Sequence, residues 1–454
     1  MSGKIFTLCA ALLILTAAPA NAATKRFLDI QQVTSPGGIH AWLVEDHSAP
    51  VISLQFAFAG AGSATDPAGK QGLVQLASNT MDEGAGDTPS PQFQKILADL
   101  SIELGYAVGR DDYNGALRTL TRTKDKAFEM LHLSLTAPRF DAEPVQRMKD
   151  ANFARIRNSL SDPDWMAARI LNDISYTGHP YANNSGGTTA SIAAITADDL
   201  RAYVKNNLTR DRLYVAVSGD ISKAELATAL DTIFASLPAT AKPANVPDIK
   251  LQNAGTIALY KRDIPQTIIL MAQPGIDRKD PDWHTAQVMN FILGGGGFGS
   301  RLTEEIREKR GLTYGVYSGF SLLDHVSTLS IETSTRNEKT AEVLDLIKAA
   351  LLKMQTTDVT AAELKDAKSY LVGSIPLALT SNAQIASMLR SLQLDNLPDT
   401  YLDTISDRIN AVTAADIRRV ANRLLTPDKP VTILVGMPAD VKPTKLIEKL
   451  PNAE

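Results

Sequence analysis

The sequence lacks several features that would assign it to common classes of protein. Its 454 residues include a single cysteine, Cys9, so neither an internal disulfide nor a cysteine-based metal site is available. The chain has 46 lysine and arginine residues against 50 aspartate and glutamate residues. It therefore lacks the excess of basic residues that is typical of a nucleic-acid-binding protein. No two of the six histidines are four residues apart, so no helical two-histidine metal motif is present. The 44% hydrophobic content indicates a folded globular chain, long enough for more than one domain.

The first 22 residues have the pattern of a secretory signal peptide. Lys4 supplies a positive charge, residues 5–18 are uncharged and apolar, and Ala20-Asn21-Ala22 fits a signal-peptidase site. This run is shorter than the roughly 20 residues that span a bilayer, although an uncleaved anchor is the alternative. We expect cleavage after Ala22, which removes Cys9. The mature chain is then periplasmic and has no membrane span.

An internal repeat divides the rest of the chain into two. Residues 196–201 (Thr-Ala-Asp-Asp-Leu-Arg) match 413–418 (Thr-Ala-Ala-Asp-Ile-Arg), and 38–43 match 255–260, each at an offset of 217 residues. One long offset at both ends of a unit indicates a duplicated domain, because solenoid repeats are only about 20–50 residues long. We predict an N-terminal domain over 23–237, a proline-rich linker over 238–253 and a C-terminal domain over 254–454.

The local patterns favour an α+β fold. Residues 51–59 alternate between apolar and polar positions, which predicts a strand with one buried face. Apolar residues at 93, 96, 97 and 100 predict an amphipathic helix that Gly105 would end. Strands and helices do not alternate regularly along the chain. We therefore predict two homologous α+β domains, each an antiparallel sheet with helices packed on one face.

A run of glycines at 294–297 formally contains the G-x-G-x-x-G dinucleotide pattern when Gly299 is included. No strand precedes it and no phosphate-binding lysine follows it, so a flexible loop between two helices is the better interpretation. Residues 300–310 then predict a short charged helix, with Gly311 at the position just past its end.

The segment 294–314, G-G-G-G-F-G-S-R-L-T-E-E-I-R-E-K-R-G-L-T-Y, resembles the C-terminal-half signature of the pitrilysin and mitochondrial-processing-peptidase family. Asp66-Pro67-Ala68-Gly69-Lys70-Gln71-Gly72-Leu73 is similar to the approach to that family's zinc helix. The resemblance covers the whole mature chain. It implies duplicated α+β domains and the chemistry of a zinc metallopeptidase.

The zinc motif itself departs from the family. Where the family has H-x-x-E-H, this sequence places Gln75 and Asn79 at the ligand positions and Ser78 at the general-base position. The distant glutamate ligand is missing too, because no glutamate occurs between Glu143 and Glu225. Carboxamides are poor zinc ligands, and serine cannot deprotonate a metal-bound water near neutral pH. We expect no zinc or other cofactor in this chain.

A second part of the family's machinery is present. The resemblance implies that Arg307 and Tyr314 reach the substrate at a zinc centre held by another subunit. Contact of Gly295, Gly296, Gly297 and Phe298 with substrate is a weaker implication. The sequence therefore predicts the zinc-free subunit of a heterodimeric peptidase, whose homologous partner bears H-x-x-E-H and whose substrates are peptides. The alternative is a non-catalytic peptide-binding or scaffold protein on the same fold.

Overall fold

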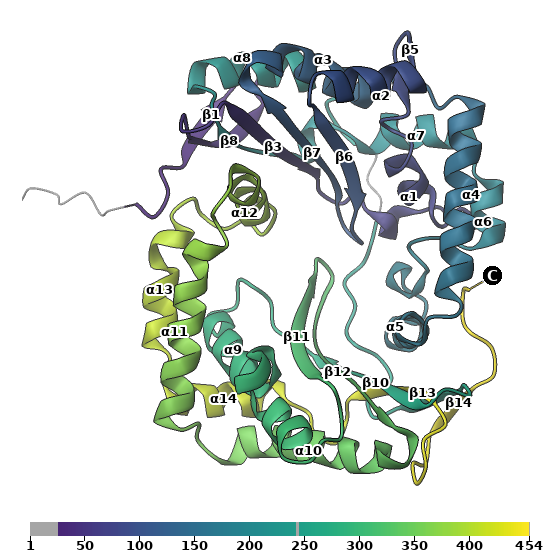
Figure 1. Cartoon of the computed structure of the whole chain (residues 1–454), viewed down its shortest axis with the longest axis vertical. Helices are drawn as coiled ribbons and strands as arrows, with labels where there is room; N and C mark the ends of the chain where they lie inside the picture. Colours follow the sequence, from purple (N-terminus) through teal and green to yellow (C-terminus); the bar gives the residue numbers. More distant parts are fainter. Residues whose placement is uncertain (1–25, 242–244, 454) are drawn as a thin grey trace, which may run out of the picture.

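The computed structural model describes residues 26–241 and 245–453, and the predicted signal peptide lies outside these ranges. Two six-stranded sheets organise the fold, each built from one half of the chain (Figure 1). The predicted linker at 238–253 falls between the last helix before it and the first strand of the second sheet. We call residues 26–237 the N-terminal half and residues 254–453 the C-terminal half.

The first sheet has the strand order β1-β2-β8-β3-β7-β6 and is antiparallel except for the pair β2–β8. The strand predicted over residues 51–59 is present, and Leu54, Phe56 and Phe58 are buried in the core that the sheet forms with its outer helices. The expectation of a single buried face was wrong, because Ser53 and Ala57 on the opposite face are buried as well. The strands of this sheet are β1 (Gln31–Thr34), β2 (His40–Glu45), β3 (Val51–Phe58), β6 (Glu103–Val108), β7 (Tyr113–Leu120) and β8 (Leu213–Gly219).

Most helices of the N-terminal half cover the outer face and the end of this sheet, and α5 packs on the second sheet instead. The predicted amphipathic helix ends earlier than expected, because Ser101 takes a left-handed φ of 54° and Gly105 lies inside β6. A short hairpin, β4 (Gly84–Ala85) with β5 (Thr88–Pro89), precedes this helix in the chain. The helices are α1 (Leu73–Ser78), α2 (Ser90–Asp99), α3 (Lys124–Thr136), α4 (Ala142–Ser159), α5 (Pro163–Ser175), α6 (Thr189–Ala194), α7 (Ala197–Asn207) and α8 (Lys223–Phe234).

The second sheet has the order β14-β9-β13-β10-β12-β11, in which the strands from β9 to β11 repeat the order of the first sheet from β2 to β6. The outer strand differs, because β14 pairs parallel with β9 whereas β1 pairs antiparallel with β2; β9–β13 is also parallel. Its strands are β9 (Ile257–Lys261), β10 (Gln266–Pro274), β11 (Val316–Leu323), β12 (Val326–Arg336), β13 (Val431–Gly436) and β14 (Lys445–Ile447). The α-helices of this half are α9 (Trp283–Asn290), α10 (Thr340–Thr356), α11 (Ala361–Leu377), α12 (Asn382–Leu394), α13 (Tyr401–Ala411) and α14 (Ala414–Leu424).

The 217-residue offset of the sequence holds in the structure. Helices α7 and α14 keep this offset at both ends, and each begins with a capping box, Thr196 with Asp199 and Thr413 with Asp416. The fold class is confirmed as α+β, with sheets that are mainly antiparallel. In the part of the chain given above, no helix is both long and apolar enough to cross a bilayer.

The two halves exchange one helix each, which the sequence analysis did not predict. Helix α12 of the C-terminal half packs against β8 and β3 of the first sheet, and α5 of the N-terminal half packs against β13 and β10 of the second (Figure 1). Leu389 of α12 is fully buried with Ala216 of β8, and Ile170 of α5 is fully buried with Ile433 of β13. Helices therefore cover both faces of each sheet, where we had expected one face.

Both ends of the described chain also contact the opposite half. Arg26 forms an ion pair with Asp403 at 2.9 Å, and the Phe27 main-chain N–H donates to the same carboxylate at 2.7 Å. At the other end, Leu450 packs in the cluster that contains Ile170 of α5. The two halves are thus tied by two exchanged helices and by both chain ends, which joins them into one cooperative body.

We predict that Leu389→Ala lowers the free energy of unfolding of the whole protein by about 2–5 kcal/mol, because it opens a cavity between the halves. Urea unfolding followed by circular dichroism should still give one transition at a lower midpoint. Leu377→Ala is the matched control, because Leu377 is 71% exposed and its loss should change stability by less than about 0.5 kcal/mol. Two separate transitions, of which only one shifts in Leu389→Ala, would contradict this cooperativity.

The tips of two hairpins meet where the halves face each other. The Asp324 main-chain N–H, in the β11–β12 turn, donates to Asp111 Oδ2 in the β6–β7 turn at 3.0 Å. Tyr181 also donates a short hydrogen bond to Asp111. Burial, helped by the nearby carboxylates of Asp324 and Asp111, raises the pKa of Asp112 to about 7, and Arg390 only partly opposes this.

Because the folded state holds Asp112 with a raised pKa, its ionisation is a cost that grows as the pH rises from about 4 through 7. We predict that Asp112→Asn raises the free energy of unfolding at pH 8 by on the order of 2 kcal/mol and by less than half as much at pH 5, where the cost has only begun to grow. Urea titrations at the two pH values test this. Asp366→Asn, on the exposed side of α11, should leave the pH dependence as in the wild type. An equal effect of Asp112→Asn at both pH values would refute the assignment.

Candidate functional site

Helix α1 carries Gln75 and Ser78, with Asn79 as its C-cap, on one face, because their spacing is i, i+3 and i+4. Gln75 Nε2 donates to Asn79 Oδ1 at 3.0 Å and to Ser78 Oγ at 3.3 Å. Ser78 Oγ donates in turn to the Gln75 carbonyl at 2.8 Å. The structure therefore brings the three predicted motif positions together, and their polar groups bond mainly to one another.

The start of α1 is fixed by close backbone approaches. Gly72 has a φ of 90°, and a Cβ at this position would lie 3.0 Å from the Gly186 carbonyl oxygen. The Asp66 carboxylate accepts hydrogen bonds from the main-chain N–H groups of Gly72 at 2.7 Å and Val74 at 3.0 Å. Burial raises the pKa of Asp66 to about 7 in spite of these bonds. The approach segment thus fixes the start of α1 through hydrogen bonds to main-chain N–H groups.

Two residues of α4 that were not among the predicted site residues complete the cluster. Asn152, only 2% exposed, accepts from Asn79 Nδ2 at 3.5 Å and from Arg155 Nη2 at 3.1 Å, both at Oδ1. Arg155 also donates to the Gly186 carbonyl at 3.2 Å. The missing glutamate between 143 and 225 was the only sequence signal, because which α4 residue faces α1 depends on the packing of the two helices.

This group of side chains does not fit a zinc ion. Its oxygens belong to neutral carboxamides and a hydroxyl, which bind zinc far more weakly than imidazole or carboxylate. The guanidinium of Arg155 adds a positive charge beside Asn152, which further disfavours a cation. Across residues 26–241 and 245–453, no three His, Cys, Asp or Glu side chains are grouped so that they could hold a metal.

The glycine run of the C-terminal half is helical, which corrects the expectation of a flexible loop. It forms a π-helical turn, η5 (Phe291–Gly295), followed by a 3₁₀ turn, η6 (Gly297–Gly299). A Cβ on Gly294 would lie 2.8 Å from the Ser318 main-chain nitrogen, and one on Gly296 would lie 2.8 Å from the Phe291 carbonyl oxygen. Glycine is needed here for close packing against β11 and η5, not for binding a phosphate.

Arg307 and Tyr314, the predicted pair, lie together with Phe298. The guanidinium carbon of Arg307 is 4.4 Å from the centre of the Phe298 ring and 5.3 Å from that of Tyr314. Both rings face solvent, with Phe298 69% and Tyr314 87% exposed. We call Phe298, Arg307 and Tyr314 the arginine stack. Large exposed aromatic side chains next to an arginine are typical of contact surfaces.

A largely buried ion pair fixes the segment that carries the arginine stack. Arg301 donates through Nε and Nη2 to the two carboxylate oxygens of Glu363, at 2.6 and 3.0 Å, which ties the segment to α11. These bonds lower the pKa of Glu363 to about 2. The predicted charged helix is a π-helical turn, η7 (Thr303–Glu308), and Gly311 follows it with the expected left-handed φ of 61°.

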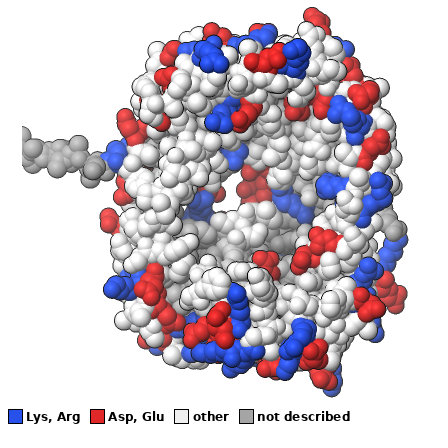
Figure 2. All heavy atoms as spheres, in the orientation of Figure 1, with Lys and Arg blue, Asp and Glu red and all other residues white. Residues whose placement is uncertain are grey.

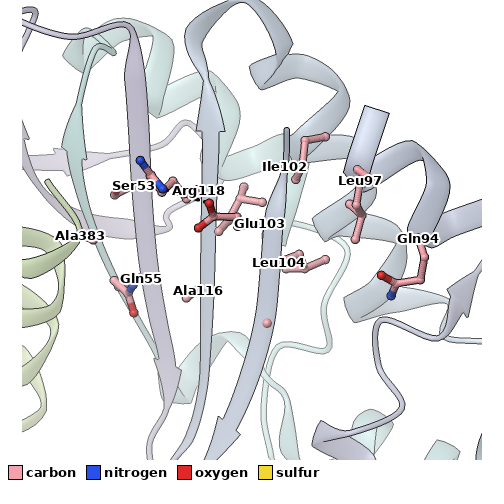
Figure 3. Close-up of a pocket in the computed structure, with 13 residues that line it drawn as sticks. Ser53, Gln55, Gln94, Leu97, Ile102, Glu103, Leu104, Ala116, Arg118 and Ala383 are labelled. Atoms are coloured by element: carbon pink, nitrogen blue, oxygen red, sulfur yellow. Dashed lines mark hydrogen bonds and ion pairs between the residues drawn. The ribbon is translucent and has the colours of Figure 1, made fainter. Parts of the chain in front are cut away.

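A pocket of about 520 Å³ lies beside β6, the edge strand of the first sheet (Figure 3). Glu103 of β6 and Arg118 of β7 form an ion pair of 3.0 Å on its wall, and Ala383 of α12 contributes from the C-terminal half. Figure 2 shows that the face drawn there is hollow at its centre, with charged side chains of both signs around the hollow. The edge strand β6 is available to pair with an extended peptide, because it has a strand neighbour on one side only.

The corresponding edge in the C-terminal half is partly occupied. The amide of Asn290 donates to the Ser318 carbonyl of β11 at 3.2 Å and accepts from the Ser318 hydroxyl at 2.7 Å. The motif cluster on α1 and the arginine stack lie in different halves, and in the described ranges no hydrogen bond or ion pair joins them. Within one chain, Arg307 and Tyr314 are therefore not part of the α1 cluster.

Comparison with known proteins agrees with these features. Residues 194–371 match the family model described as the peptidase M16 inactive domain. A crystal structure of a peptidase M16 inactive domain from Pseudomonas fluorescens is similar, with a TM-score of 0.85 and 30% identity. The match covers 92% of this chain and all of that one.

Two curated relatives extend over most of the sequence. The non-peptidase homolog YmxG of Helicobacter pylori is 29% identical over 381 residues, which cover 82% of this chain and 86% of that protein. The probable mitochondrial-processing peptidase subunit beta of Schizosaccharomyces pombe is 24% identical over 390 residues, which cover 82% of this chain and 84% of that protein.

We predict that Gln75→His, Ser78→Glu and Asn79→His together do not create a tight zinc site, because Asn152 and Arg155 stay in place. Adding Asn152→Glu supplies a third protein ligand and should raise zinc affinity at least about tenfold. Competition with a chromophoric chelator measures both affinities, and the wild-type chain is the control. If the wild type bound one zinc ion per chain and Gln75→Ala abolished that binding, the conclusion that the α1 cluster does not fit zinc would be overturned.

Proposed function

Because the chain belongs to the peptidase M16 (pitrilysin-like) family, we propose that it is the zinc-free subunit of an exported two-chain metallopeptidase. In this proposal a homologous partner carries H-x-x-E-H and its zinc, and this chain supplies Arg307 and Tyr314. The chain alone is inactive and holds no cofactor of its own. Its substrates are peptides bound in extended form.

The observation that carries the proposal is the contrast between two groups of side chains. The α1 cluster is half-buried and its side chains bond mainly to one another and to Asn152, so few of its polar groups remain for a substrate. The rings of the arginine stack are exposed, with Tyr314 at 87%, whereas the Arg307 side chain is half-buried. Within the described chain, the donors of Arg307 are largely unused, because its ion pair with Glu308 is 3.6 Å long. Donors exposed in this way are suited to an acceptor outside the chain.

The chemistry of the stack fits the transition state of peptide hydrolysis. Attack on a peptide carbonyl turns its oxygen into an oxyanion, and the partner's zinc would supply the activated water for that attack. The guanidinium of Arg307 carries a permanent charge and several N–H donors, and the Tyr314 hydroxyl adds another donor. Both can stabilise the developing charge when the substrate carbonyl lies within hydrogen-bond distance.

Peptide binding draws support from the edge strand β6. Its outward main-chain groups can pair with an extended segment, which gives affinity without a fixed sequence. The Glu103–Arg118 ion pair at the pocket beside β6 offers both charges to side chains of that segment. Export rests on the sequence pattern of the first 22 residues, and with it we propose a periplasmic location.

A non-catalytic peptide-binding or scaffold role on the same fold is the second candidate. The description of the Helicobacter pylori relative as a non-peptidase homolog favours it. This role would use the hollow and the β6 edge but would not need Arg307 or Tyr314. The two candidates therefore differ in what happens when the arginine stack is altered.

We predict that peptide cleavage appears only when this chain is mixed with an H-x-x-E-H homologue from the same organism. In the mixture, Arg307→Ala should lower kcat/KM about 10²–10³-fold and Tyr314→Phe about tenfold, because each removes a donor to the oxyanion. A quenched-fluorescence peptide assay measures cleavage, and size-exclusion chromatography confirms that assembly is intact. Arg310→Ala is the matched control, since Arg310 lies nearby but is bonded to Glu305.

Unchanged cleavage by Arg307→Ala would remove the catalytic assignment. Cleavage by this chain alone would contradict the zinc-free proposal. Stable assembly with peptide binding but without cleavage would favour the scaffold role.

A further inference from the structure

Arg307 is held mainly by ring faces. Its guanidinium carbon lies 4.4 Å from the Phe298 ring centre, which is closer than its 5.3 Å approach to Tyr314. Its one ion pair, with the neighbouring Glu308, is 3.6 Å long, which exceeds a normal hydrogen-bond distance. Among the described residues, no shorter polar contact holds the side chain of Arg307.

The glycine run explains how Phe298 reaches this position. Gly297 has a left-handed φ of 59°, so the chain turns sharply just before Phe298. The turn is held on both sides, because the Gly296 N–H donates to the Phe291 carbonyl at 2.8 Å and Ser300 Oγ donates to the Gly297 carbonyl at 2.8 Å. Phe298 thus projects from a fixed turn although its ring is 69% exposed.

Stacking and hydrogen bonding use different parts of a guanidinium. The faces of the planar group lie against rings, whereas its N–H bonds point outward in the plane. A carboxylate partner would consume those N–H bonds and neutralise the charge, whereas a phenyl ring does neither. Ring contacts can therefore restrict the rotamers of Arg307 while the donors that a peptide oxygen needs stay available.

We propose that Phe298 is a positioning residue that holds the Arg307 guanidinium so that its N–H bonds face the substrate. This inference rests on the proposed function, in which Arg307 donates hydrogen bonds to the substrate. The stacking of Phe298 on Arg307 can be measured in this chain without a partner. It is an alternative to the expectation that Phe298 acts by contacting substrate, and the tests below distinguish the two roles.

The chain by itself gives the first test. Phenylglyoxal modifies exposed guanidinium groups, and mass spectrometry of peptide fragments reports the rate at each arginine. Phe298→Ala should raise the modification rate of Arg307 about two- to fivefold, in line with the strength of an exposed cation–π contact. Phe298→Tyr should restore the wild-type rate, while Phe298→Leu, of similar size without a ring face, should not. The rate at Arg310 is the internal control.

The mixture with the H-x-x-E-H partner gives the second test. Phe298→Ala should lower kcat about three- to tenfold with less than a twofold change in KM, and Phe298→Tyr should recover kcat. Unchanged Arg307 reactivity in Phe298→Ala, or full restoration by Phe298→Leu, would overturn the positioning role. If the mixture cleaves no peptide while Phe298→Ala still frees Arg307, the proposed function fails and the positioning role stands. A rise in KM alone would show that Phe298 contacts substrate and would overturn the proposal.

Discussion

The constraint on which the rest of the structure depends is that each sheet needs cover on both faces. The outer helices of each half cover one face, and the other face of each sheet is apolar enough to need a second layer. Helix α12 of the C-terminal half covers this face of the first sheet, and α5 of the N-terminal half covers that of the second. Because neither half covers the inner face of its own sheet, the exchanged helices fix the position of one half against the other and with it the hollow between them.

The sequence predicted the fold class and the repeat because both depend on local patterns. Alternation in β3 and the capping sequences at Thr196 and Thr413 act over a few residues, so they can be read without knowing the fold. The exchange of α5 and α12 could not be predicted in this way, because an amphipathic helix does not reveal which sheet it will cover. The predicted end of a helix at Gly105 failed because Ser101 had already ended it.

The candidate site shows the same limit. The sequence showed that Gln75, Ser78 and Asn79 stand where the zinc motif has histidine, glutamate and histidine. It also showed the spacing of Arg307 and Tyr314. Asn152 and Arg155 were missed because they reach α1 from another helix. The stacking of Phe298 on Arg307 was missed because the glycine run was interpreted as mobile, whereas packing against Ser318 and Phe291 holds it in a helical turn.

The two edge strands of the repeat have unequal freedom, and this limits how the chain can associate. Asn290 occupies part of the β11 edge, whereas β6 keeps its outward main-chain groups. An exposed edge accepts any extended polypeptide, including a second copy of the same chain. At high protein concentration, the β6 edges of two copies can pair with each other. This self-association would compete with the binding of an extended peptide to β6. A high concentration of the isolated subunit would then lower the fraction of chains that can bind a peptide.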